Sequence, residues 1–297
     1  IRLETAQLPE GEAMPLSKVR VDATPQLLEQ AFQRLDEARG LIERTGTASV
    51  RISGIQIVLP SAPGQKPLTL DVNALDLALR PDGEVEIKGD VGLDGRTGTL
   101  VATSQTVNGV TSALSAKLSD LEVTPFLLQK AEDGTPREGI EGALTFEMAA
   151  TRARETTQPA MTATLHQSPG RFYFDGIPQV FSGADIKVAY DFDKNSIEIL
   201  QSQAQFGPTI LPLTGAIIDL NRLDPNDKRL GFGLDLLISG GTATGATDGE
   251  QPAHFDLKAV GRYLSADREL QFDQMGVSSP TGRMAGSLRI RFGEQSP

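Results

Sequence analysis

Most of this chain alternates apolar and polar residues with a period of two, and no other feature constrains its fold as strongly. The alternation begins after Gly46 and recurs to about residue 292. Its clearest runs are 74–79, 84–93, 110–118, 144–148, 185–193, 232–238, 255–263 and 283–292. Because successive side chains of a strand point to opposite faces, each run predicts a β-strand with one apolar side. Strands of this kind are typical of an antiparallel sheet.

Short turn sequences separate these runs. Asp94-Gly95 and Asn108-Gly109 are typical of two-residue hairpins. In the run 50–59 the apolar phase changes at Gly54, which predicts a β-bulge. Residues 239–253 lack large apolar side chains and predict a mobile loop between two strands. We expect about 14–18 strands in all.

One long helix is predicted before the alternating region. Thr24 and Pro25 suit a helix start, and apolar residues follow at intervals of three and four. Gly46 stands where a helix C-cap glycine is common. The pattern predicts a helix over 25–45. Two placements are open, a cap on one end of the sheet and packing along its concave side. We expect the cap, because sheet ends otherwise leave unpaired groups.

Part of this helix sequence recurs 100 residues later. Residues 21–31 and 121–131 share the pattern Thr-Pro-x-Leu-Leu-x-x-Ala. The second copy predicts a short helix that ends near Gly134. A structural repeat and a common way of starting helices both account for the likeness.

Composition excludes several classes of function. The 39 acidic and 28 basic residues give a net charge of −11, which argues against a nucleic-acid partner. The absence of cysteine excludes disulfides, thiolate metal sites and a cysteine nucleophile. No apolar run approaches the roughly 18 residues of a membrane span. No phosphate-loop, dinucleotide or nucleophile-elbow motif is present, so no cofactor, metal or catalytic residue is predicted.

The remaining candidates for chemistry have ordinary interpretations. His166 and His254 are interpreted as polar loop or strand-edge residues, although an undetected hydrolase would need one of them. Asp219, Asp224 and Asp227 lack the spacing of a calcium loop. Residues 171–174, Arg-Phe-Tyr-Phe, are interpreted as a strand that faces the core on both sides rather than as a base-stacking surface.

A long sheet must cover its apolar face. It can fold into a sandwich or barrel with a filled core, or curl into an open trough whose floor accepts acyl chains. Periodicity leaves both options open. The predicted class is therefore mainly β: a long antiparallel β-meander sheet curled into an elongated groove or sandwich, with one long and one short α-helix. Residues 1–46 form an N-terminal segment and 47–297 the sheet domain, with two stacked halves, 47–135 and 136–297, as an option.

The chain resembles the AsmA-like superfamily of bacterial envelope proteins, and most closely its YhdP/TamB branch. The likeness is diffuse and covers residues 48–292. It rests on residues 118–125 before a short helix, on the strand series 181–190 and 213–217, and on the closing segment 282–288.

This resemblance implies a function that periodicity does not. Members of the family are anchored in the inner membrane by an N-terminal helix, which is missing from this sequence. They extend through the periplasm as an apolar β-groove and are implicated in moving phospholipid towards the outer membrane. The family implies no catalytic residue and no cofactor. A chain of 297 residues would be one part of such a bridge.

We therefore expect a non-enzymatic periplasmic segment that shields the acyl chains of a phospholipid or related lipid during envelope biogenesis. The alternative is a structural or partner-binding β domain with a filled core and no lipid. The predicted lipid-binding residues are Leu75, Leu77, Leu79, Leu144, Phe146, Ile186, Val188 and Tyr190.

Overall fold

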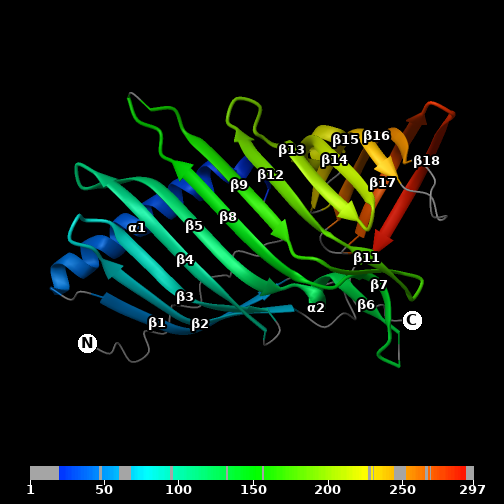
Figure 1. Ribbon diagram of the computed structural model, residues 1–297. Coiled ribbons are helices and arrows are strands. Elements are labelled where there is room, and N and C mark those ends of the chain that lie inside the picture. Colours follow the sequence, from blue (N-terminus) through cyan, green and yellow to red (C-terminus); the bar gives the residue numbers. More distant parts are fainter. Residues whose placement is uncertain are drawn as a thin grey trace.

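The computed structural model describes residues 20–46, 49–59, 68–93, 96–131, 133–155, 157–226, 229, 231–243, 252–264, 267 and 269–291. In these ranges the chain is mainly β, as predicted, with two sheets and one long helix (Figure 1).

The larger sheet has 14 antiparallel strands in the order β1-β2-β3-β4-β5-β8-β9-β12-β13-β14-β15-β16-β17-β18. Each strand pairs with its neighbour in the chain except where β6–β7 and β10–β11 are inserted. The meander prediction is therefore confirmed. The strands are β1 (Ser49–Leu59), β2 (Leu68–Leu79), β3 (Val85–Leu93), β4 (Arg96–Val107), β5 (Val110–Glu122), β8 (Ala143–Thr151), β9 (Ala160–Gln167), β12 (Gly183–Asp191), β13 (Ser196–Phe206), β14 (Thr209–Asp219), β15 (Gly231–Ala243), β16 (Ala253–Leu264), β17 (Glu269–Ser279) and β18 (Gly282–Arg291).

The two insertions meet in a second, four-stranded sheet that the sequence did not predict. Its order is β11-β10-β7-β6. The strands are β6 (Leu128–Lys130), β7 (Pro136–Ile140), β10 (Gly170–Phe174) and β11 (Ile177–Phe181). The short helical elements of the chain are η2 (Val21–Ala23), α2 (Thr124–Leu127) and α3 (Leu220–Leu223).

The long helix, α1 (Thr24–Thr45), lies where the sequence placed it. Proline in its first turn has no N–H to leave unpaired, and Gly46 ends the helix with φ of 62°. Its buried stripe includes Leu28, Phe32 and Ile42, which recur at helical spacing.

The second predicted helix is wrong beyond its first turn. Helix α2 has only four residues, and Leu128 already has the extended dihedrals −107° and 122°. Residues 128–130 instead pair with β7. Strand pairing therefore overrides the helical start, and Gly134 lies in the turn between these strands, with φ of 83°.

Two further predictions need correction. Residues 239–243 were expected in a loop, but they extend β15, because Gly241 pairs with Phe255 and Ala243 with Ala253. A register shift between Ile238 and Gly241 accommodates the glycines.

Gly54 has φ of 75°, but the β1–β2 register does not shift across it. The irregularity appears one strand away, as a shift between Val72 and Ala74 in the β2–β3 pairing. The alternation of apolar and polar residues changes phase in β1 and in β2 at positions that lie opposite each other. The pairing register between the two strands is therefore retained.

The strand registers place the predicted apolar phases on one side of the large sheet, which we call the apolar face. One continuous row of cross-strand partners runs through all 14 strands and contains only apolar residues and glycine. Its members are Val50, Leu77, Ile87, Ala102, Ala116, Met148, Ala163, Val188, Ile199, Gly215, Leu236, Ala259, Met275 and Gly286. The opposite side, which we call the polar face, bears ion pairs such as Lys117–Glu147.

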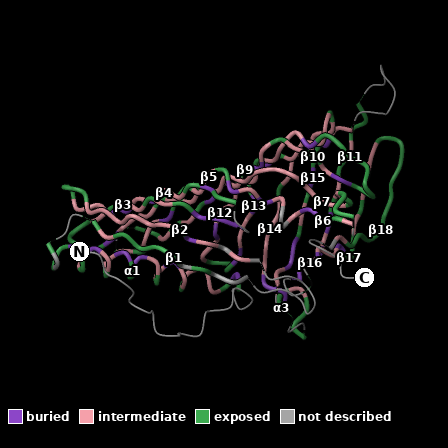
Figure 2. The backbone as a smooth tube through the Cα atoms, turned by 90° about the horizontal axis from the view of Figure 1, so that it is seen from below, coloured by how far each residue is buried: buried purple, intermediate pink, exposed green. Residues whose placement is uncertain are grey.

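The core is divided into local clusters rather than gathered in one place, and Figure 2 shows buried segments scattered along the molecule. One cluster lies between α1 and the sheet, a second lies at the opposite strand ends, and a third covers β14–β17. In the first, Leu28 and Phe32 pack on Ala150 near the end of β8. Helix α1 therefore lies on the apolar face, near one end of the middle strands β5, β8 and β9, and does not cover an unpaired edge of the sheet as the expected cap would.

Candidate functional site

All eight predicted lipid-binding residues lie on the apolar face. Leu77 and Val188 belong to the row that crosses the sheet. A second row runs beside it from β2 to β12 and contains Leu75, Gly89, Leu100, Leu118, Phe146, Leu165 and Ile186. The register therefore brings side chains that are more than 100 residues apart onto one surface.

We call the two rows, from β2 to β12, the central band. Its large side chains are half-buried, and only Ala102 and Ala163 are fully buried. Five predicted residues belong to the band: Leu75, Leu77, Phe146, Ile186 and Val188. The band is thus a continuous apolar surface seven strands wide.

The other three predicted residues lie beside the band. Leu79 follows Leu77 on β2 towards the end crossed by α1. Tyr190 is only 6% exposed. Its ring packs edge-on against the ring of Phe192, with 4.9 Å between the ring centroids. Burial and the nearby carboxylates raise the pKa of Tyr190. Leu144 packs against the cluster of Leu121 at the opposite strand ends.

A cover borders the band on each side. Helix α1 lies on one side, over Leu114, Ala150 and Met161. On the other side Leu127 of α2 packs on the cluster that contains Leu118 and Leu121.

The four-stranded sheet adds to this second cover. Phe172 and Phe181 contact Phe206, at the end of β13, with ring centroids 5.6 and 5.1 Å apart. The contacts of α1 fall to one side of the band, and the cluster under the second cover reaches the band at Leu118, on its opposite border.

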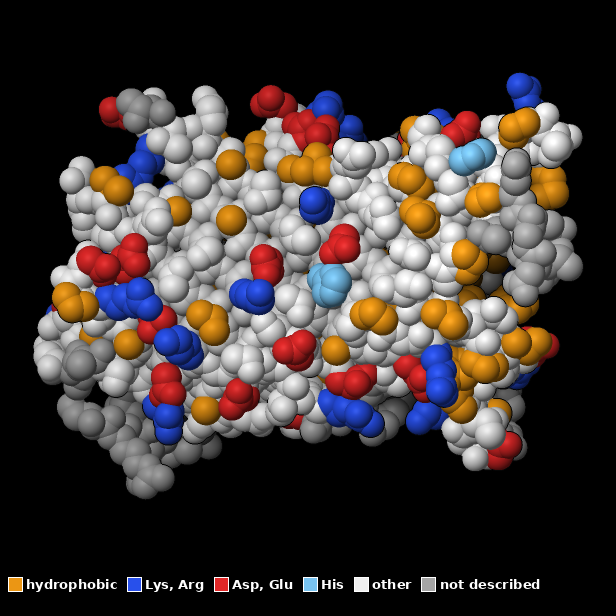
Figure 3. Space-filling view, in the orientation of Figure 1, with side chains coloured by type: hydrophobic (Ala, Val, Ile, Leu, Met, Phe, Trp, Pro, Cys, Tyr) orange, Lys and Arg blue, Asp and Glu red, His pale blue; other side chains and the backbone are white. Residues whose placement is uncertain are grey.

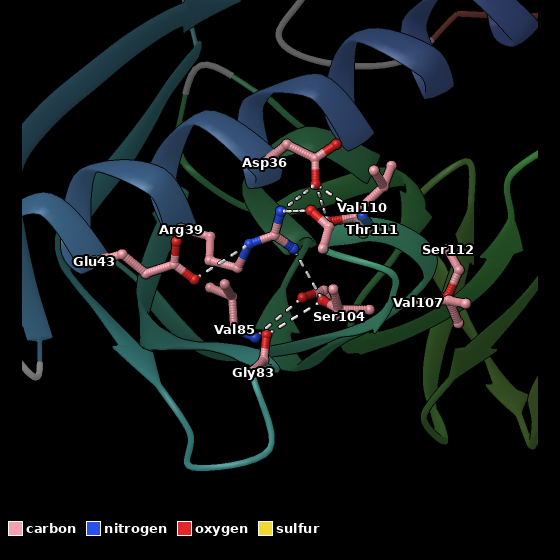
Figure 4. Close-up of polar contacts among 12 residues, drawn as sticks. Asp36, Arg39, Glu43, Gly83, Val85, Ser104, Val107, Val110, Thr111 and Ser112 are labelled. Atoms are coloured by element: carbon pink, nitrogen blue, oxygen red, sulfur yellow. Dashed lines mark hydrogen bonds and ion pairs between the residues drawn. The ribbon is translucent and has the colours of Figure 1, made fainter.

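Polar contacts fix the C-terminal half of α1 to the β4–β5 hairpin (Figure 4). Arg39 donates to Thr106 Oγ1 at 3.1 Å and to the carbonyl of Gly109. Asp36 accepts from the N–H and the hydroxyl of Thr111 at 2.8 and 2.7 Å. Burial alone would raise the pKa of Asp36, but these hydrogen bonds and nearby arginines lower it.

Arg152, just after β8, fixes the middle of the helix. It donates to Glu29 Oε2 at 2.9 Å and to Asp36 Oδ2 at 3.0 Å. Its guanidinium also lies 5.7 Å from the centroid of the Phe32 ring. The hydrogen bond from Arg152 lowers the pKa of Glu29, and the same bond raises the pKa of Arg152.

Asp219 fixes the start of the helix. Its buried carboxylate accepts the backbone N–H groups of Val21 and Asp22 at 2.8 and 2.9 Å. Sequence reasoning considered this residue only as a calcium ligand and missed its role. No local signal links residues that lie 198 positions apart.

The two histidines lie apart on the large sheet. His166 Nδ1 is 2.7 Å from Asp185 Oδ1 on the polar face, where both side chains are exposed. Figure 3 shows charged side chains spread over this face. His254 lines a shallow depression of about 520 Å³ together with Asp256, Ser278 and Arg283.

No group of three or more His, Cys, Asp or Glu side chains in the described part of the chain could hold a metal ion. No helix among the same residues has the length and hydropathy needed to cross a bilayer.

The aromatic segment 171–174 differs in part from its prediction. Phe172 is half-buried and Tyr173 is buried, as expected of a strand that faces the core on both sides. Phe174 is 68% exposed. It is the last residue of β10 and lies next to the turn that joins β10 to β11.

No family model matches this chain, and neither the curated proteins nor the solved structures contain a match. The resemblance to the AsmA-like superfamily therefore stays a prediction.

Proposed function

We propose that this chain is a non-enzymatic lipid carrier that shields phospholipid acyl chains on the central band. One observation carries the proposal: two unbroken rows of apolar residues, interrupted in size only by alanines and one glycine, cross seven strands, and their large side chains are only half-buried. Apolar surface in water costs about 25 cal/mol per Å², so an apolar ligand that covers the band would be stabilised there.

The dimensions of the band suit an acyl chain. Neighbouring strands lie about 4.8 Å apart, so six steps between seven strands span about 29 Å. One leaflet of bilayer hydrocarbon is about 15 Å thick, half of the full core. An extended acyl chain that lies across the strands therefore fits within the band.

The proposal includes a curled sheet. We propose that the sheet bends around the band as an open groove, with α1 along one rim and the four-stranded sheet along the other. The separation of the core into local clusters supports an open shape, since a closed sandwich would join residues of distant strands in one cluster.

The resemblance to the AsmA-like superfamily extends the proposal to the cell. It implies a periplasmic location, an inner-membrane anchor outside this sequence and phospholipid transport towards the outer membrane. The polar face, with its exposed ion pairs, suits an aqueous compartment.

Lipid extraction from detergent-free protein tests the proposal. Mass spectrometry of the wild type should find stoichiometric phospholipid, and Val188→Asp should lose it, because a charge on the band opposes acyl contact. Ala189→Asp is the matched control, since the adjacent side chain lies on the polar face.

Two results would contradict the proposal. A folded wild-type protein without lipid would favour the filled-core, partner-binding domain. Equal lipid loss in both variants would show that Val188 has no special place in binding. Circular dichroism of each variant separates unfolding from lost binding, and Met148→Ser provides a milder change on the band.

A further inference from the structure

Strand β18 is the last strand of the large sheet and has an apolar and a basic side. On the apolar face, Met284 is 73% exposed and Leu288 is 41% exposed. Arg283 and Arg289 lie on the polar face, and Arg291 ends the strand. The outer edge of β18 pairs with no other strand among the described residues, so its side chains and backbone are accessible.

The charge of this region differs from that of the rest of the chain. Residues 253–291 contain six Lys and Arg and four Asp and Glu, whereas the remainder contains 22 and 35. Strand β18 itself has three arginines and no acidic residue. At physiological salt the electrostatic field of a charged group is screened over about 8 Å. A surface in contact with β18 would therefore respond to the charge of β18 rather than to the net charge of the whole chain.

Nearby acids are engaged by neighbouring arginines. Arg262 binds Asp273 at 2.6 Å, and Arg289 binds the buried carboxylate of Glu269 at 3.0 Å. Arg283 has no ion-pair partner among the described residues. Its guanidinium is therefore available to an external anion.

We propose that β18 docks edge-on against an anionic phospholipid surface. Exposed Met284 and Leu288 would enter the interfacial region, while Arg283 would bind a lipid phosphate. N–H groups on the outer edge, which pair with no strand in the described part of the chain, add further donors to phosphate. This docking goes beyond the carriage of lipid and does not depend on it.

A second copy of the chain fits this edge less well. If two β18 strands paired about Gly286 with their apolar faces aligned, Arg283 would lie opposite Arg289. Like charges that are directly opposite destabilise a strand pair. An anionic surface has the complementary charge.

Vesicle co-sedimentation tests the docking. The 297-residue chain should bind vesicles of phosphatidylcholine with about 30 mol% phosphatidylglycerol more strongly than pure phosphatidylcholine vesicles. Arg283→Glu should lower the partition coefficient at least about fivefold, since one basic residue near the surface contributes about fivefold and the new carboxylate adds repulsion. Met284→Ser should also weaken binding, and raised salt should reduce the preference for anionic vesicles.

Matched variants keep the test specific. Arg34→Glu makes the same change of charge on an 81% exposed side chain of α1, and Val107→Ser shortens a 47% exposed side chain elsewhere. Both should bind vesicles like the wild type. Equal binding by Arg283→Glu and Arg34→Glu would overturn the proposal, as would a concentration-dependent dimer that Met284→Ser dissociates. Val188→Asp separates the two proposals, because it should lose carried lipid and keep vesicle binding.

Discussion

At the scale of single residues, Arg152 makes the most connected contact between α1 and the sheet. It joins two carboxylates of the helix and one aromatic ring, and its side chain is only 18% exposed. A planar guanidinium can serve several acceptors in fixed directions, which lysine cannot. Removal of Arg152 would leave Glu29 and Asp36 with fewer partners.

We expect Arg152→Met to lower the free energy of unfolding by about 1–3 kcal/mol, because hydrogen bonds to charged groups are lost in a partly buried setting. Urea denaturation measures this loss. Arg34→Met is the control, since the exposed Arg34–Glu37 pair should contribute less than about 0.5 kcal/mol. Equal effects of the two changes would show that α1 does not depend on Arg152.

At the scale of elements, the β2–β3 pairing depends on a glycine. Gly89 lies opposite Leu75 beside the irregularity at Ala74. A Cβ atom at Gly89 would overlap the carbonyl oxygen of Ala74 and approach Leu75 Cδ2 to 2.7 Å. The close approach of backbones therefore excludes a side chain here.

We expect Gly89→Ala to destabilise the protein by about 1–3 kcal/mol through overpacking, and to weaken hydrogen-exchange protection in β2 and β3 first. Gly276→Ala is the matched strand control, because no atom lies within 4 Å of its added Cβ. Unchanged exchange in β2 and β3 would count against this close approach.

Sequence patterns predicted individual helices and strands better than the contacts between distant parts of the chain. The helix over 25–45 and the apolar phases of Leu77, Phe146 and Val188 follow from local spacing, so both could be predicted. The four-stranded sheet joins two insertions, and Asp219 meets Val21 across most of the chain. Such contacts form between residues that are far apart in the sequence, and the local spacing of apolar residues does not predict them.

At the scale of the whole molecule, carboxylates couple stability to pH. The pKa values of Glu29, Asp36, Asp76, Glu86 and Asp191 are lowered, chiefly by hydrogen bonds and neighbouring cations, with burial opposing. Because the folded pKa lies below the unfolded value, the stabilisation is complete above the unfolded pKa. It is lost as pH falls through the folded pKa.

We expect the urea midpoint to be level near neutral pH and to fall below about pH 4.5, where unfolded Glu and Asp begin to bind protons. Asp36→Asn should start from a lower midpoint and lose less on acidification. A midpoint that rises between about pH 4.5 and pH 3 would contradict this assignment of charges.

The order of strands in the large sheet has a consequence for folding and for evolution. Most strands of the large sheet pair with the next one in the chain, so assembly can spread hairpin by hairpin, whereas α1 and the four-stranded sheet must wait for strands that are distant in the sequence. In such a nearly linear architecture each unit depends mainly on its neighbours. Gain or loss of a whole hairpin would change the length of the apolar face by two strands and preserve the register elsewhere.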